Sequence, residues 1–152
     1  MLYIKLSIGS PAPNFELPDQ DGHTQKLSAY RGQWVLLYFY PKDFTPGCTE
    51  EACSFRDQYS ALKKRVTILG VSADTAEQHR AFADRYSLPF TLLADTQRKT
   101  IHDYGADGLL FPKRVSFLIN PDGNIAQLYP TVKPSEHAGQ ILSDLNTLQA
   151  VR

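Results

Sequence analysis

The sequence has no excess of charge of either sign. Among its 152 residues, Lys plus Arg and Asp plus Glu number 16 each, so the formal net charge is zero. A neutral chain has no general electrostatic attraction to nucleic acid or to an anionic membrane surface. We therefore expect neither partner, and a small neutral substrate fits this composition better.

Long hydrophobic runs are also missing. The longest apolar run, WVLLYFY from Trp34, has the length of a strand, whereas a transmembrane helix needs about 20 apolar residues. The first residues, MLYIKLSIGS, are interrupted by Lys5 and Ser7 and lack the apolar stretch of a signal peptide. We expect a cytoplasmic protein, although an organellar precursor whose transit peptide had been removed would look the same.

Cysteine and histidine are scarce. In a reducing compartment, two cysteines are more often catalytic, metal-binding or inert than permanently bridged. The four histidines are scattered, with no H-x-x-H or Cys–His spacing, so we expect no zinc site.

The remaining composition is that of an ordinary folded protein. Hydrophobic residues make up 42% and charged residues 21% of the chain, which is far from the composition of a disordered protein. A chain of this length suits one compact core. We expect a single domain over residues 1–152.

The pattern of apolar and turn residues predicts an ordered series of elements. In chain order these are a hairpin within residues 10–33, a strand 34–40, a helix 49–64, a strand 66–73, a helix 75–87, a strand 90–95, a short helix within 96–105, strands 114–120 and 125–130, and a helix from Lys133 or Pro134. This order predicts an α/β protein with a thioredoxin-like fold: a central mixed β-sheet flanked by helices, with an N-terminal β-hairpin. A flavodoxin-like sheet is the alternative, and the late hairpin around PDGN argues against it.

Both cysteines, Cys48 and Cys53, lie in the stretch FYPKDFTPGCTEEAC. Cys48 falls in the first turn of the predicted helix, where free backbone N–H groups and the helix dipole favour a thiolate. On a helix, residues five apart are separated by about 7.5 Å along the axis and about 140° around it. Their Cα atoms would lie roughly 8 to 9 Å apart, beyond the usual range for a disulfide. A bridge between them would require the helix to unwind.

Taken alone, Cys53, Thr45 and Arg114 each have a simpler interpretation. An inert core cysteine is the commoner role for Cys53. Thr45 could be a turn residue, and Arg114 a solvated arginine at a strand edge.

The stretch resembles the peroxiredoxins, whose P-x-x-x-T-x-x-C loop corresponds to Pro41, Thr45 and Cys48. The C-x4-C spacing resembles the Q-type subgroup, also called bacterioferritin comigratory proteins. Similarity continues through APNFELPDQDG, ILGVSAD, FTLLAD and RVSFLINPDGNI, nearly the whole chain. One departure is Asn120, where Asp is commoner; it does not touch the reacting groups.

The resemblance implies a role for each site residue. Cys48 would be the peroxidatic cysteine and form a sulfenic acid. Thr45 and nearby backbone N–H groups would hold the peroxide, Pro41 would shield the sulfenic acid, and Arg114 would stabilise the thiolate. Cys53 would be the resolving cysteine that forms an intramolecular disulfide with Cys48. Glu51 lies one turn along from Cys48, and from this position we expect it to brace the loop or Arg114.

The resemblance also implies what the protein works with. Hydrogen peroxide and organic hydroperoxides would be the substrates, thioredoxin or a related dithiol protein the reductant, and antioxidant defence and redox homeostasis the role. No metal or organic cofactor is required, and a monomer is expected. Two alternatives share the same residues: a redox sensor that is oxidised once and changes a partner contact, and a dithiol reductase or isomerase acting on protein disulfides.

Overall fold

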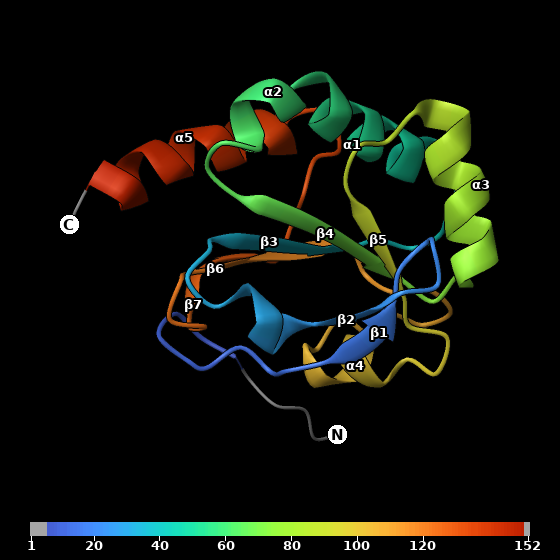
Figure 1. Ribbon diagram of the computed structural model, residues 1–152, viewed down its shortest axis with the longest axis horizontal. Coiled ribbons are helices and arrows are strands. Elements are labelled where there is room, and N and C mark those ends of the chain that lie inside the picture. Colours follow the sequence, from blue (N-terminus) through green and yellow to red (C-terminus); the bar gives the residue numbers. More distant parts are fainter. Residues whose placement is uncertain (1–5, 151–152) are drawn as a thin grey trace.

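A five-stranded mixed sheet forms the centre of the structure, a computed structural model in which residues 6–150 are described (Figure 1). The strand order is β5-β4-β3-β6-β7. Strands β3, β4 and β5 are mutually parallel, whereas β6 is antiparallel to β3 and β7 is antiparallel to β6. A separate two-stranded antiparallel hairpin, β1-β2, precedes them.

The element order agrees with the predicted order, and the predicted thioredoxin-like arrangement is confirmed. The strands are β1 (Glu16–Pro18), β2 (Thr24–Lys26), β3 (Val35–Phe39), β4 (Thr67–Ser72), β5 (Thr91–Ala94), β6 (Val115–Ile119) and β7 (Ile125–Tyr129). The helices are η1 (Leu27–Tyr30), α1 (Pro46–Asp57), α2 (Tyr59–Leu62), α3 (Ala76–Tyr86), α4 (Lys99–Asp103) and α5 (His137–Ala150). None of these helices, within the described residues, is long and apolar enough to cross a membrane.

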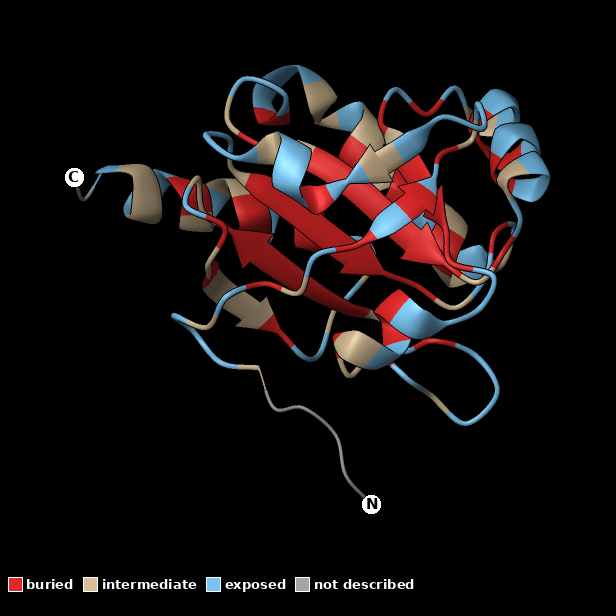
Figure 2. Ribbon diagram, turned by 60° about the horizontal axis from the view of Figure 1, so that its bottom comes forward, coloured by how far each residue is buried: buried red, intermediate tan, exposed pale blue. Residues whose placement is uncertain are grey.

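Strand β3 is apolar throughout because both faces of the sheet are covered. Leu36 and Tyr38 face a core formed with α1, α2, α3 and α5, and Leu37 and Phe39 face a second core on the other side. Figure 1 shows α1, α2 and α5 above the sheet, α3 at its right-hand side, and α4 with the β1-β2 hairpin below it. In Figure 2 the inner strands of the sheet are buried, the edge strand β7 is mostly of intermediate exposure, and the outer side of the helical layer is exposed. A strand with two covered faces needs no polar alternation.

Some element boundaries differ from the predicted ones. The helix predicted over 49–64 begins earlier, at Pro46, and is interrupted at Gln58 to give α1 and α2. Gln58 has φ −106° and ψ 14° and serves as the C-cap of one helix and the N-cap of the next. The last helix begins at His137, not at Lys133 or Pro134.

Helix α3 begins with a complete capping box. The Thr75 side chain accepts a hydrogen bond from the Gln78 backbone N–H, and the Gln78 side chain accepts one from the Thr75 N–H. This reciprocal arrangement satisfies two backbone donors that helix geometry leaves free.

The segments that build the site meet at one edge of the sheet, where β3 and β4 end and β6 begins. Phe39, the last residue of β3, pairs with Val115, the first residue of the antiparallel β6. Phe39 also pairs with Val71, near the end of the parallel β4. The residues that follow β3 and β4 therefore meet the residue that precedes β6, Arg114, at the same edge. This edge corresponds to the carboxyl ends of the parallel strands, where α/β proteins place their sites.

Candidate active site

The N-terminus of α1 presents Cys48 at this edge. Thr45 is the N-cap and Pro46 the first helical residue, a position where proline is tolerated because its missing N–H would have no helical partner. Cys48 thus lies in the first turn, as predicted, with only 1% of its surface exposed. The geometry exposes this sulfur to backbone N–H groups and to the positive end of the helix dipole. Both cysteines are unbridged.

Arg114 reaches Cys48 from the start of β6. It lies one residue before the strand, not within it as predicted. Its Nη1 donates a hydrogen bond to Cys48 Sγ at 3.5 Å and another to Glu51 Oε1 at 2.8 Å. One guanidinium therefore holds the sulfur and a carboxyl group one turn further along the same helix.

Gly47 allows Arg114 to lie against the helix. A Cβ atom at position 47 would come within 2.8 Å of the Arg114 Nη2 atom and 3.8 Å of the Pro134 side chain. Contacts under 3 Å are essentially never seen for real Cβ atoms. Because Gly47 has no side chain, the Arg114 guanidinium can approach the Cys48 thiol.

Glu51 is an ionisable group with no exposed surface. Burial raises the pKa of its carboxyl group from 4.5 to about 7, although the charge and hydrogen bond of Arg114 act in the opposite direction. Burial also lowers the pKa of Arg114, but the negative charges of Cys48 and Glu51 outweigh this and raise it above its usual value. The expected contact between Glu51 and Arg114 is present.

Two buried oxygen atoms beside this group lack hydrogen-bond partners among residues 6–150: the Tyr38 hydroxyl and Glu51 Oε2. Burial, followed by the negative charge of Glu51, raises the pKa of Tyr38 well above its usual value. Tyr38 is therefore a neutral donor. The Tyr38 hydroxyl and Glu51 Oε2 are thus two buried polar atoms without a partner, and the charge of Glu51 acts on the hydroxyl.

Thr45 and Pro41 border the loop between β3 and α1. The Thr45 hydroxyl donates to the Lys42 carbonyl at 2.7 Å, which closes the loop onto itself and leaves the hydroxyl oxygen able to accept a further bond. Pro41 is partly buried at the beginning of the loop. Contact of either residue with a substrate stays a prediction.

Cys53 lies on the same helix as Cys48. Because α1 is continuous from Pro46 to Asp57, ideal helix geometry places the two residues about 7.5 Å apart along the axis. Cys53 is partly exposed, whereas Cys48 is buried. A bond between the two sulfur atoms requires α1 to open.

Three buried residues beside the loop were not predicted as part of the site: Asp43, Asp74 and His79. His79 is fully buried, and both of its ring nitrogens have hydrogen-bond partners. Its ring Nδ1 lies 2.6 Å from the Asp43 Oδ2 atom in the cysteine loop. No spacing in the sequence links two residues that far apart.

Comparison with known proteins places this geometry in a family. Residues 8–128 match the model of the AhpC/TSA family. The chain belongs to this family, the peroxiredoxins. It is 44% identical over 149 residues to chloroplastic peroxiredoxin Q of Triticum aestivum, covering 95% of this chain and 69% of the relative. It is 41% identical over 151 residues to a putative peroxiredoxin bcp of Coxiella burnetii, covering 93% of this chain and all of the relative.

A solved structure agrees with these relatives. The bacterioferritin comigratory protein of Xanthomonas campestris superposes with a TM-score of 0.86 at 30% identity, covering 94% of this chain and 97% of the other. The resemblance to the Q-type subgroup is confirmed. This peroxiredoxin is a thiol-dependent peroxidase, an oxidoreductase that reduces peroxides.

Proposed function

We propose that Cys48 is the peroxidatic cysteine of this enzyme. Its thiolate attacks one oxygen of the hydroperoxide, the O–O bond breaks, and an S–O bond forms. Sulfur is oxidised to a sulfenic acid, and the departing oxygen takes a proton and leaves as water or an alcohol. The observation that carries this proposal is the position of Cys48, in the first turn of α1 and 3.5 Å from the Arg114 guanidinium.

Arg114 supplies fixed positive charge in this step. It stabilises the thiolate and the negative charge that moves onto the departing oxygen, and it does so without reorganisation because Glu51 holds it in place. Thr45 and the backbone N–H groups of Gly47 and Cys48 hold the peroxide, and Pro41 limits the access of further peroxide to the sulfenic acid. An Arg114→Ala variant should fold and react more slowly with peroxide; an unchanged rate would remove Arg114 from the site.

Cys53 resolves the oxidised cysteine. Its thiol attacks the sulfenic sulfur of Cys48, water leaves, and an intramolecular disulfide forms. Because both residues lie on α1, the helix unwinds locally in this step. Thioredoxin or a related dithiol protein then reduces the disulfide by thiol–disulfide exchange and returns two thiols. A dithiol reductase would need a pair that closes without unfolding, so this helix counts against that alternative.

The wider role follows from the same chemistry. The substrates are hydrogen peroxide and organic hydroperoxides, and the Xanthomonas campestris protein is described by its alkyl peroxide reduction activity. The role is antioxidant defence and redox homeostasis, performed by a monomer that folds as one domain over residues 1–152. A cytoplasmic location stays a prediction to be tested by cell fractionation, since the Triticum aestivum relative is chloroplastic.

The intact mass of the reduced protein after one equivalent of hydrogen peroxide, with rapid quenching and thiol trapping, tests this mechanism. Loss of two hydrogens with both thiols consumed supports the internal disulfide. Cys48→Ser should abolish peroxide consumption, and Cys53→Ser should react once and then stall or become overoxidised with thioredoxin as donor. A mass gain of one oxygen or a disulfide-linked dimer in the wild type would contradict the role of Cys53. Absence of any reaction would contradict the role of Cys48.

A further inference from the structure

A buried polar cluster fastens the cysteine loop to the rest of the fold. Asp43, in the loop between β3 and α1, accepts hydrogen bonds from the Tyr40 hydroxyl at 2.6 Å and lies 2.6 Å from His79 Nδ1 on α3. The other ring nitrogen of His79 lies 2.9 Å from the Leu93 carbonyl of β5. His79 thus connects the cysteine loop to a neighbouring helix and to a strand.

Asp74 adds a second attachment from the end of β4. Its Oδ2 accepts hydrogen bonds from the Asp43 backbone N–H at 2.9 Å and from the Ser72 hydroxyl at 2.5 Å. Its Oδ1 lies 3.5 Å from Lys42 Nζ. Both the side chain and the main chain of Asp43 are therefore held by groups outside the loop.

The hydrogen-bond acceptors fix how many protons the cluster holds. A carbonyl oxygen cannot donate, so His79 Nε2 must carry a hydrogen. The contact between His79 Nδ1 and Asp43 Oδ2 needs a second hydrogen between the two atoms. Whichever of the two atoms carries this hydrogen, His79 and Asp43 share a strong hydrogen bond. The His79 side chain has no exposed surface, so water does not compete for this bond.

Asp43, Asp74 and His79 also have the residue types of a metal site, with one ligand atom from each within 4.8 Å of the others. The Asp43 and His79 atoms, however, contact each other directly at 2.6 Å, and every ligand atom already has a hydrogen-bond partner. Direct contact leaves no space for an ion between them. The cluster is a mechanical attachment of the loop.

What the cluster holds in place is a strained turn. Phe44, directly after Asp43, has φ 69°, a left-handed conformation that is unfavourable for a bulky residue and persists only when its surroundings impose it. Its ring packs on Phe82 and Tyr86 of α3 at centroid distances of 5.0 and 6.3 Å. Helix α3 thus holds both Asp43, through His79, and Phe44. The next residue, Thr45, is the N-cap of α1.

We propose that His79 is a positioning residue for the peroxidase cycle. By fastening Asp43, it keeps the strained loop and the first turn of α1 in the arrangement that reacts with peroxide, and it opposes the unwinding that brings Cys53 to Cys48. The inference rests on the proposed roles of Cys48 and Cys53. It assigns to His79 opposite effects on two successive steps: it promotes oxidation of Cys48 and restrains formation of the disulfide.

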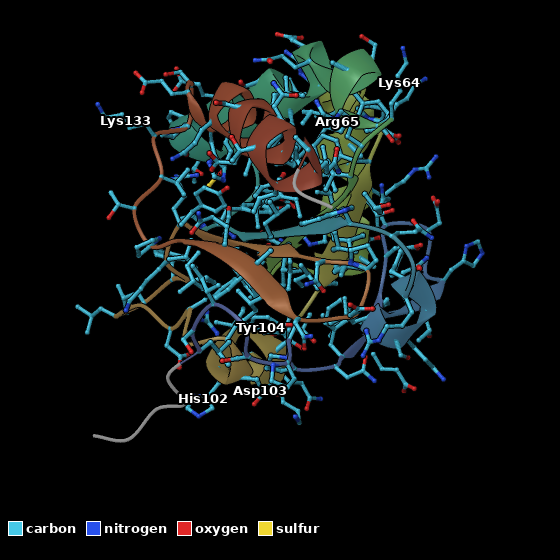
Figure 3. The ribbon with its side chains drawn as sticks, turned by 90° about the vertical axis from the view of Figure 1, so that its left-hand side faces the viewer. Lys64, Arg65, His102, Asp103, Tyr104 and Lys133 are labelled. Atoms are coloured by element: carbon cyan, nitrogen blue, oxygen red, sulfur yellow. The ribbon has the colours of Figure 1, made fainter. Side chains whose placement is uncertain are left out.

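The test measures the two steps separately in His79→Gln, which can replace one ring donor but not both. Reduced protein is mixed with hydrogen peroxide, quenched in acid at millisecond intervals and analysed by thiol alkylation and mass spectrometry. The readouts are the second-order rate of Cys48 oxidation and the first-order rate at which the sulfenic acid becomes a disulfide. His102→Gln is the matched control: its Nδ1 contacts Asp107 at 2.8 Å, but the pair is exposed. His102 lies on α4 beneath the sheet (Figure 3).

In His79→Gln we expect oxidation of Cys48 to slow at least tenfold and disulfide formation to accelerate at least threefold, with both rates unchanged in His102→Gln. His79→Asn, whose amide can donate in place of Nδ1, should fall between His79→Gln and the wild type. Two unchanged rates, or two rates that fall together, would overturn the inference, because a merely structural residue does not move the steps in opposite directions.

Two further cases are decided by other measurements: a His79→Gln variant that does not fold, and a wild type that forms no internal disulfide. If His79→Gln does not fold, Asp43→Asn, which keeps the shape of the side chain, must show the same opposite changes, together with faster amide hydrogen exchange in α1 from Thr49 onward, where the helical hydrogen bonds begin. If the wild type forms a sulfenic acid but no internal disulfide, the proposed role of Cys53 fails. The effect of His79→Gln on the oxidation rate alone then decides the positioning role.

Discussion

Glu51 should make the stability of the reduced enzyme fall as the pH rises through neutrality. Its pKa is raised from 4.5 to about 7 by burial, so between these values the folded state binds more protons than the unfolded state. The free energy of unfolding therefore decreases with rising pH in this window, and the loss is complete above the folded-state pKa. Glu51→Gln removes the titrating group while keeping a carbonyl oxygen for Arg114.

The magnitude follows from the two pKa values. A rise from 4.5 to about 7 corresponds to roughly 3.4 kcal/mol when both states are fully titrated. Part of this has already been lost at pH 5, because the unfolded carboxyl group is mostly ionised there. Between pH 5 and pH 8 we expect the wild type to lose about 2.5 kcal/mol relative to Glu51→Gln.

Urea unfolding of the reduced proteins at both pH values measures this difference, and other titrating groups cancel in the comparison between variants. Glu50→Gln is the matched control, since Glu50 is the preceding residue on the same helix and is exposed. The free energy of unfolding of Glu50→Gln should equal that of the wild type at both pH values. Parallel pH dependence of the wild type and Glu51→Gln would refute the idea that this carboxyl group titrates near neutrality.

Further predictions concern the helices around the site. Gly47→Ala would push the Arg114 guanidinium away from Cys48, and stopped-flow measurement should show peroxide reduction slowed on the order of tenfold to a hundredfold; an unchanged rate would mean that the exact position of Arg114 is unimportant. Gly139→Ala, which meets no atom within 4 Å, should leave this rate unchanged and stabilise α5 by about 0.5 to 1 kcal/mol in urea unfolding. Thr75→Ala should lose the capping box and destabilise the protein by about 1 kcal/mol; unchanged thermal unfolding would contradict a contribution from this cap.

The fold could be predicted from the sequence because its signals are local. The uninterrupted apolar run in β3 indicates a strand covered on both faces, and the structure has two cores there. The break at Gln58 could not be predicted, because the apolar spacing of Ala52, Phe55, Tyr59 and Leu62 continues across it. Spacing reports which side is buried and not whether each backbone hydrogen bond is made.

The site residues also differ in how far the sequence predicts them: those close together in the chain could be proposed, and those brought together by packing could not. Cys48 could be proposed from its place in the first turn of the predicted helix, and the roles of Pro41, Thr45 and Cys53 from the resemblance that the same short stretch carries. Arg114 could be assigned only by resemblance, since the register of β3 with β6 brings it to the loop. The pairing of Asp43 with His79, 36 residues apart, depends on how α3 packs against the loop. No pattern in the sequence reports that packing.

The buried carboxyl group of Glu51 couples the proposed redox cycle to protons. Glu51 and Cys48 lie on α1, whereas Arg114 precedes β6 and belongs to the sheet edge. In the proposed unwinding of α1 that forms the disulfide, the acid would leave its cation and enter water, where its ordinary acidity would return. At a pH between 4.5 and about 7, each oxidation would therefore release a proton from this group, and each reduction would take one up. The midpoint potential of the cysteine pair would accordingly carry an additional pH dependence set by the buried Glu51 carboxyl group.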